Sequence, residues 1–282
     1  MSVQLKPIIP VGDSTPNARQ NLPVIASGQV AQSFSNVAEV YDDHAVFQLP
    51  SAQRLAKYLP TSANGQWLDL GCGTTAVWPD LLARTPQAHW FGVDLASGML
   101  RTAKQRQPDH CFVQADACHL PVLSSSLHGV FSNLMAQWLS PQAFLAEQFR
   151  VLSPGGTLLF TTLLEHSLHE LRQAYERADR VAPVNPQQPE SVYLSAMTNS
   201  GLKLQSWQAD PITHHFADLR AVFNSLKGTG AVASTVIRPT ARPPGLMGRQ
   251  WWQTMQQSYP TTADGMYPLT FNIGYAVLRK PL

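Results

Sequence analysis

One short stretch near residue 70 constrains the fold of this chain more than any other. An apolar segment at residues 67–70 runs into a Gly-Cys-Gly turn at residues 71–73. A second apolar segment, residues 90–93, follows and ends in Asp94. Glycines let the backbone approach a ligand closely, and an acid at the tip of the next strand can accept both hydroxyls of a ribose. The stretch therefore predicts an α/β sheet that binds a nucleotide-containing cofactor.

The residues around the turn leave two cofactor classes open. Gly71, Gly73 and Ala76 satisfy the Gly-x-Gly-x-x-Ala pattern of dinucleotide-binding folds. Asp69 argues against a pyrophosphate there, because a second anion beside the turn would repel it, and favours a positively charged cofactor such as S-adenosylmethionine. The segment resembles motif I of class I methyltransferases, acid-x-Gly-x-Gly-x-Gly, except that Thr75 takes the place of the third glycine.

Apolar strands and amphipathic helices alternate along the chain. Predicted strands cover residues 66–70, 89–93, 111–114, 128–132, 157–162, 202–209 and 269–278. Predicted helices cover residues 77–84, 141–152, 167–182 and 191–200, and another begins at Ser97. Such alternation is typical of a doubly wound, mostly parallel sheet, which binds ligands beyond the carboxyl ends of its strands. Four polar residues stand at those ends: Asp69, Asp94, Asp116 and Asn133.

Composition and periodicity indicate where the folded domain begins and which kinds of site it lacks. Residues 1–33 show no periodicity, which predicts a poorly ordered extension before a single domain at 34–282, with cap elements at about 34–60, 167–190 and 216–260. No run of about eighteen apolar residues is present, so we expect no membrane span. The three cysteines form no Cys-x-x-Cys pair, which argues against a disulfide framework and a zinc site and fits a reducing cytoplasm. No metal site is predicted.

Several segments beyond the turn narrow the resemblance to one family. They are residues 131–138, 160–163, 167–171, 225–231 and 267–271, of which the Ser-Leu-Lys-Gly-Thr-Gly-Ala segment at 225–231 is the most discriminating. The chain from about Phe34 to its C-terminus resembles the malonyl-[acyl-carrier protein] O-methyltransferases of biotin synthesis. The resemblance implies a seven-stranded Rossmann-like class I methyltransferase fold with helical cap insertions. It also implies methyl transfer from S-adenosylmethionine to the free carboxylate of a malonyl thioester, whose methyl ester primes pimeloyl formation.

The resemblance also implies roles for individual residues. The methionine end of the cofactor would lie against Asp69, Gly71, Cys72 and Gly73. The ribose would be held by Asp94, and the adenine would be bordered by Leu95, Met99, Asp116 and Ala117. The methyl donor would lie above Asn133 and Leu134, and Tyr41 would close over the cofactor.

A basic block marks the expected substrate region. Residues 219–263 contain no Asp or Glu and five cations, Arg220, Lys227, Arg238, Arg242 and Arg249, whereas the rest of the chain is net acidic. Such a block would attract a carboxylate substrate on an acidic carrier protein. We expect Arg220 or Lys227 to pair with the carboxylate, with Tyr41 as a further candidate. An ionised carboxylate needs no general base to accept a methyl group.

Three other functions stay open on the sequence alone. The dinucleotide pattern allows an NAD-dependent oxidoreductase, although no Tyr-x-x-x-Lys pair follows it. A methyltransferase of another small molecule, or of malonyl-coenzyme A, would share the same cofactor residues. The missing third glycine would also suit a degenerate domain that only binds a partner. A formal net charge of +2 without Lys/Arg tracts argues against nucleic acid.

Overall fold

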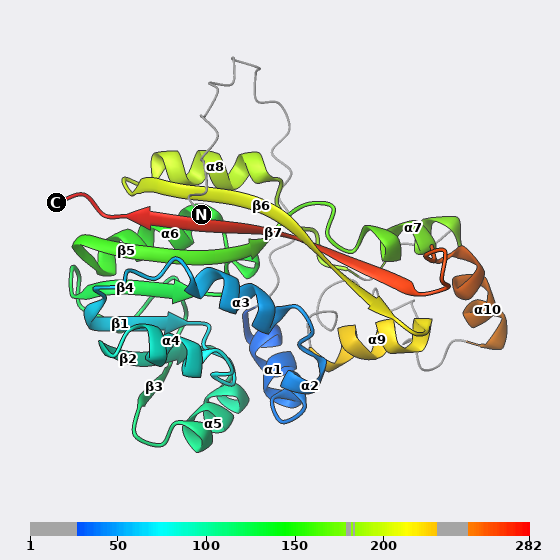
Figure 1. The fold of residues 1–282 in the computed structure, drawn as a ribbon, viewed down its shortest axis with the longest axis horizontal. Coiled ribbons are helices and arrows are strands. Elements are labelled where there is room, and N and C mark those ends of the chain that lie inside the picture. The colour runs from blue at the N-terminus through cyan, green and yellow to red at the C-terminus, as the bar shows by residue number, and fades with distance from the viewer. Residues whose placement is uncertain (1–26, 179–181, 183, 230–247) are drawn as a thin grey trace, which may run out of the picture.

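The computed structural model describes residues 27–178, 182, 184–229 and 248–282. Their centre is a seven-stranded sheet with the order β3-β2-β1-β4-β5-β7-β6 (Figure 1). The strands are β1 (Asn64–Leu70), β2 (Gln87–Asp94), β3 (Cys111–Gln114), β4 (Leu127–Ser132), β5 (Leu152–Leu163), β6 (Lys203–Phe216) and β7 (Tyr267–Arg279). The first five strands are parallel, and β7 runs antiparallel between β5 and β6. The predicted doubly wound fold is confirmed.

Helices cover both faces of the sheet, and short ones gather at its carboxyl edge. They are α1 (Ser27–Val37), α2 (Tyr41–His44), α3 (Gln48–Ala56), α4 (Trp78–Arg84), α5 (Ser97–Arg106), the 3₁₀ turn η1 (Ala136–Trp138), α6 (Pro141–Val151), α7 (His169–Arg177), α8 (Glu190–Asn199), α9 (Leu219–Gly228) and α10 (Arg249–Ser258). A side-chain cap sets the start of α6 and of α9 locally. At α6, for example, the Ser140 hydroxyl accepts the Ala143 N–H, and Pro141 occupies the first turn.

Alternate residues of the central strands enter two separate cores, one on each face of the sheet. On β1, Trp67 packs into the core that also contains Phe131, whereas Leu68 packs into the opposite core with Val130. This period of two, with both faces buried, explains why the parallel strands read as continuous apolar runs.

Three predicted elements have different bounds in the structure. The strand expected at 157–162 is β5, which begins at Leu152. The strand expected at 202–209 continues to Phe216, because β6 pairs with β7 from Lys203 opposite Arg279 to Phe216 opposite Tyr267. The helix expected at 167–182 begins at His169 and ends at Arg177. The extended β6 and β7 run past the other strands, and α7, α9 and α10 surround their far end (Figure 1).

The N-terminal prediction was wrong in part. Residues 1–26 lie outside the described part, but residues 27–33 belong to helix α1 instead of a poorly ordered extension. Phe34 gives this helix a packing partner, since its ring meets Trp138 edge-on at 5.6 Å between centroids. The Ser35 hydroxyl also accepts the Gly98 N–H at the start of α5, at 3.1 Å. These contacts bind α1 to the domain.

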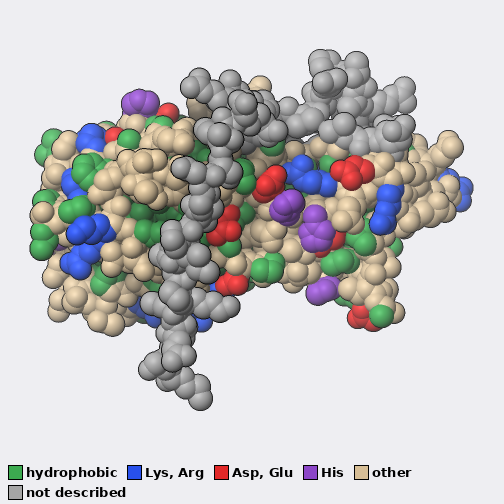
Figure 2. All heavy atoms as spheres, turned by 90° about the horizontal axis from the view of Figure 1, so that it is seen from above, with side chains coloured by type: hydrophobic (Ala, Val, Ile, Leu, Met, Phe, Trp, Pro, Cys, Tyr) green, Lys and Arg blue, Asp and Glu red, His purple; other side chains and the backbone are tan. Residues whose placement is uncertain are grey.

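The surface carries mixed charges. Figure 2 shows basic, acidic and histidine side chains interspersed on one face, without a basic stripe of the kind that tracks nucleic acid. Among the described helices, none has the length and apolar character needed to cross a bilayer.

Candidate active site

A cavity lies where the parallel strands end. It is lined by the segments that follow β1, β2, β3 and β4, with α1, α2, α9 and residues 184–187 around it. Ten of the predicted site residues line it: Tyr41, Gly71, Gly73, Asp94, Leu95, Met99, Asp116, Ala117, Asn133 and Leu134. The sheet therefore brings together residues that are spread over more than ninety positions of the chain.

The glycine turn is held by backbone hydrogen bonds to β2. The N–H groups of Gly71 and Cys72 donate to the Val93 carbonyl at 2.8 and 3.1 Å. Gly71 and Gly73 have φ angles of +73° and +53°, a region that favours glycine. A Cβ on Gly73 would meet no atom within 4 Å, which leaves open space at this residue of the cavity wall.

Thr75 explains the missing third glycine of the turn. Its φ of +64° is left-handed, so the fold keeps the backbone geometry that a glycine would adopt freely. The residue is buried, and its hydroxyl donates to the Thr74 carbonyl at 2.6 Å. A β-branched residue in this conformation is strained, and the surrounding structure has to maintain it. The turn therefore has a left-handed residue at this position although the glycine is absent.

The carboxylate of Asp94, at the end of β2, is oriented by hydrogen bonds from the glycine turn and from Ala96. One carboxylate oxygen accepts the Gly73 N–H at 2.9 Å, and the other accepts the Ala96 N–H at 2.8 Å. Burial raises the pKa of Asp94, whereas these backbone hydrogen bonds oppose the rise. Each oxygen keeps further acceptor capacity toward the cavity, which suits a pair of ligand hydroxyls.

The structure does not bring Asp69 and Cys72 to the cavity wall, contrary to the prediction. Asp69 is 3% exposed and accepts the Trp78 indole N–H at 2.6 Å, so its carboxylate points toward α4. Burial raises the pKa of Asp69 to about 7. Cys72 is buried with its Sγ close to Gly92, and burial raises the pKa of its thiol. Both residues support the turn from behind.

Helix α2 holds Tyr41 beside the turn. The neighbouring Asp42 accepts the Thr74 hydroxyl at 2.7 Å and forms an ion pair with Arg106 of α5. Burial and the nearby Asp94 raise the pKa of Tyr41, so its phenol stays protonated and is a hydrogen-bond donor. Tyr41 lines the cavity, and its role as an aromatic cover over the cofactor stays a prediction.

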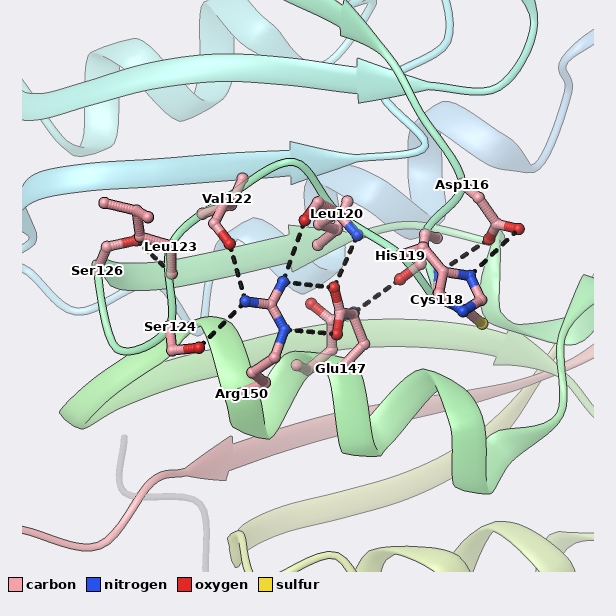
Figure 3. Close-up of polar contacts among 12 residues, drawn as sticks. Asp116, Cys118, His119, Leu120, Val122, Leu123, Ser124, Ser126, Glu147 and Arg150 are labelled. Atoms are coloured by element: carbon pink, nitrogen blue, oxygen red, sulfur yellow. Dashed lines mark hydrogen bonds and ion pairs between the residues drawn. The ribbon is translucent and has the colours of Figure 1, made fainter.

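The loop after β3, which carries Asp116 and Ala117, is anchored to α6. Glu147 accepts the Leu120 N–H at 2.7 Å, and Arg150 donates to the Leu120 and Val122 carbonyls at 3.1 and 2.8 Å (Figure 3). Arg150 also forms an ion pair with Glu147 at 2.7 Å, which lowers the pKa of Glu147.

Within that loop, the carboxylate of Asp116 accepts the Cys118 N–H at 2.8 Å (Figure 3). The loop that would border the adenine is thus held by α6 at Leu120 and Val122 and by its own Asp116–Cys118 hydrogen bond.

Asn133 connects three elements behind the cavity. Its side-chain oxygen accepts hydroxyl protons from Ser51 and Thr161, both at 2.8 Å, and its amide donates to the Gln48 carbonyl at 3.0 Å. The next residue, Leu134, has a φ of +53° and donates its N–H to Thr161 at 2.9 Å. This network ties α3 to the ends of β4 and β5, so the cavity floor is rigid.

Comparison with known proteins identifies the family. A model of the methyltransferase domain matches residues 68–160, which include the glycine turn and Asp94. The chain is 36% identical over 261 residues to a malonyl-[acyl-carrier protein] O-methyltransferase from Herminiimonas arsenicoxydans, covering 92% of this chain and 98% of the relative. It is 34% identical over 266 residues to one from Alcanivorax borkumensis, covering 92% and 89%. The chain belongs to the malonyl-[acyl-carrier protein] O-methyltransferase family.

Solved structures with low sequence identity share the fold. A Bacillus halodurans protein described as a putative methyltransferase superposes with a TM-score of 0.57 at 18% identity, over 83% of this chain and all of that chain. The [4+2]-cyclase SpnF superposes with a TM-score of 0.60 at 14% identity, over 94% and 100%. Because a methyltransferase-like protein and a cyclase share this fold, the fold alone does not assign a reaction.

Membership of the methyltransferase family makes S-adenosylmethionine the cofactor of this chain. The residues present fit it: the wall is open at Gly73, Asp94 has acceptor capacity for the ribose, and an anchored loop carries Asp116. Among the described lining residues the only charged ones are Asp94 and Asp116, which suits a cofactor with positive charge and no phosphate. The individual contacts remain predictions.

The predicted substrate cations lie away from the cavity. Arg220 and Lys227 are exposed on α9, and the guanidinium of Arg220 stacks over the Trp252 ring at 5.8 Å. Helix α9 turns Leu226 and Thr229 toward the cavity instead, because its amphipathic face packs inward. Arg249 is exposed, and Arg238 and Arg242 lie outside the described residues.

Sequence reasoning missed several lining residues. They come from α1 (Ser27, Val30, Ala31), from the start of α3 (Phe47, Gln48), from η1 (Gln137, Trp138) and from the segment Val184, Asn185, Pro186 and Gln187. The spacing of Val30 and Phe34 could have revealed an inward face on α1. The 184–187 segment has no periodicity to reveal it.

Proposed function

We propose that this protein transfers the methyl group of S-adenosylmethionine to the free carboxylate of a malonyl thioester on an acyl-carrier protein. The product, a malonyl methyl ester, would prime pimeloyl formation in biotin synthesis. The observation that carries the proposal is the likeness to relatives of that name over about nine-tenths of the chain, cap segments included. The cavity joins the cofactor residues to these cap segments, since Gly73, Leu226 and Thr229 all line it.

The chemistry needs positioning more than proton transfer. The cofactor supplies a methyl group on a sulfonium: a carboxylate oxygen bonds to the methyl carbon, the carbon–sulfur bond breaks, and its electron pair stays on sulfur. A carboxylate has a pKa near 3–4 and is ionised at neutral pH, so no general base is required. The protein's contribution is to hold the two reactants in line, an effect equivalent to about 10⁵ M or more.

The cap end of the cavity is apolar and would exclude water from the reacting groups. Leu163, Leu168, Val184, Leu226 and Phe271 present apolar surface there. Such a lining would accept the apolar part of a thioester arm and leave the carboxylate poorly hydrated. A poorly hydrated carboxylate interacts more strongly with any charge nearby.

The exposed cations of the cap have a separate role in this proposal. Arg220, Lys227 and Arg249 are solvent-exposed on α9 and α10, where they would attract an acidic carrier protein. Charge complementarity of this kind chiefly raises the association rate. Comparing turnover of malonyl-carrier and malonyl-coenzyme A at low and high salt would show which thioester is preferred.

The test is methyl transfer to a defined acceptor. The protein would be incubated with methyl-labelled S-adenosylmethionine and malonyl-carrier protein, with acetyl-carrier protein as a control that lacks only the carboxylate. We expect label in a base-labile ester on the malonyl form and none on the acetyl form. Label on neither form, while the cofactor binds, would refute the proposal. Equal label on both would move the methylation site to the carrier itself.

A further inference from the structure

The described lining of the cavity holds no positive charge for a substrate carboxylate. Among its described lining residues there is no Lys, Arg or His, and its two acids, Asp94 and Asp116, follow β2 and β3. An anion that enters an apolar space needs a compensating positive charge. The exposed Arg220 and Lys227 do not reach the wall. Among the described residues, a cation just behind the wall is placed to supply the charge.

Arg172 of α7 occupies that place at the cap end. Its Nη2 donates to the Gln187 side-chain oxygen at 3.0 Å and to the Asn185 carbonyl at 3.2 Å. Its Nε lies 3.5 Å from the Ser167 carbonyl. Asn185 and Gln187 both line the cavity, so the guanidinium is one residue behind the wall.

The positive charge of Arg172 has only neutral hydrogen-bond partners among the described residues. Arg54, Arg106 and Arg150 each form an ion pair with a carboxylate, whereas no such pair is found for Arg172 in the described part. Glu165 and Glu176 influence it from exposed positions without pairing with it. Arg172 is half-buried, and burial lowers its pKa, which is the signature of an incompletely compensated charge.

We infer that Arg172 supplies the positive charge that recognises the substrate carboxylate. The Gln187 amide oxygen holds the acceptor position on Nη2 that a carboxylate oxygen takes when the substrate binds. One carboxylate oxygen is then held by the guanidinium, and the other bonds to the methyl carbon as the carbon–sulfur bond breaks. Arg172 keeps its proton throughout. The inference rests on the proposed function and extends it to substrate selection.

We expect the protein to bind its charged substrate more tightly than its neutral product. The methyl ester is neutral, so it loses the attraction to Arg172 that the carboxylate had. A hydrogen bond to a charged group changes affinity by about tenfold or more. The unmodified protein should therefore bind malonyl-carrier more tightly than carrier bearing the malonyl methyl ester.

Arg172→Gln tests this through a ratio of affinities. In the variant we expect the preference for malonyl-carrier over its methyl ester to fall about tenfold or more, with the dissociation constant of S-adenosylmethionine unchanged. Arg177→Gln is the matched control, since Arg177 lies on the same helix, is exposed and donates to the Ser258 carbonyl. It should leave the ratio unchanged. Equal weakening of both carrier forms by Arg172→Gln would overturn the inference and give Arg172 a structural role.

A second variant keeps the test valid if Arg172→Gln fails to fold. Gln187→Glu places a fixed carboxylate beside Arg172, so its KM for malonyl-carrier should be about tenfold or more above that of Gln187→Ala. Equal KM values for the two variants would also overturn the inference. If the unmodified protein forms no malonyl methyl ester, the proposed function fails and the inference fails with it. Ester formation together with an unchanged affinity ratio in Arg172→Gln overturns the inference alone.

Discussion

Gly71 and Gly73 both have positive φ angles but different surroundings. Alanine substitutions at the two sites should therefore affect stability and cofactor binding differently. A Cβ on Gly71 would lie 2.7 Å from Met135 Cγ, whereas a Cβ on Gly73 would meet nothing within 4 Å. Left-handed backbone costs an alanine about 1–2 kcal/mol at either site. Gly71→Ala should lower the free energy of unfolding by that amount plus about 1–3 kcal/mol for the clash.

Gly73→Ala should lower the free energy of unfolding only by the backbone cost. It should weaken cofactor binding more than Gly71→Ala does, because its methyl group would occupy open space at the cavity wall. Denaturant titration and calorimetry with S-adenosylmethionine would compare the two variants. Equal cofactor affinity in Gly73→Ala and the unmodified protein would show that the turn does not contact the cofactor.

Asp69 predicts an unusual dependence of stability on pH. Its pKa rises from an ordinary 3.8 to about 7 in the folded protein, because burial disfavours the charged form. Between these values the folded state holds a proton that the unfolded state has lost, so this contribution to stability falls as pH rises from about 4 to about 7. Asp69→Asn should remove that slope, which amounts to a few kcal/mol.

Asp109→Asn, at an exposed aspartate, is the control and should leave the slope in place. Unfolding free energies measured at intervals between pH 4 and 8 would decide the matter. The same slope in Asp69→Asn and the unmodified protein would contradict the raised pKa.

Three residues in and around the glycine turn show which features of single residues can be predicted from the sequence. Asp94 was predictable, because an acid after a buried strand has a recognisable pattern. The orientation of Asp69 was not, because it depends on the Trp78 indole nine residues later. The departure at Thr75 was visible in the sequence, but its left-handed φ follows from how the turn is held.

At the scale of elements, the loop after β3 depends on one helix. Arg150 and Glu147 of α6 hold its backbone, and Glu147 is nearly buried. Arg150→Ala removes the partner of that carboxylate and should destabilise the fold by roughly 1–3 kcal/mol. Because Asp116 and Ala117 belong to the loop, we expect several-fold weaker cofactor binding as well.

The loss of stability in Arg150→Ala should depend on pH, because the pKa of Glu147 differs between the folded and unfolded states. The pKa of Glu147 is lowered in the folded state, so its contribution is present above an ordinary value of 4.5 and is lost as pH falls through the folded pKa. Arg150→Ala should therefore lose stability at pH 7 and lose less below pH 4. Arg101→Ala, on the exposed face of α5, serves as control for denaturation and calorimetry. An unchanged cofactor affinity in Arg150→Ala would mean that the loop does not contribute to binding.

The elements that sequence predicted well are those with local signals. The parallel strands β1 to β5 are apolar runs followed by turns, and their order along the chain was correct. The second half of β6 was missed, because Pro211, His214 and His215 interrupt its apolar pattern. Its pairing with β7 is a tertiary contact that no local pattern encodes.

At the scale of the whole molecule, the two ends of the cavity were unequally predictable. The cofactor end is built from strand termini, which the alternation of elements brings to one edge. The cap end combines residues of α1, α9 and the 184–187 segment, whose approach depends on packing between distant parts of the chain. Arg172 is half-buried behind this end, and no local sequence pattern distinguishes it from other arginines.

The fold is shared with a [4+2]-cyclase, so the reaction has to be tested directly. The most direct measurement is nuclear magnetic resonance of the carrier-bound acyl group after reaction with ¹³C-methyl S-adenosylmethionine. We expect an ester O-methyl signal attached to the malonyl carboxylate, dependent on this protein. A labelled methyl on nitrogen or carbon, or label that stays on the cofactor, would contradict it.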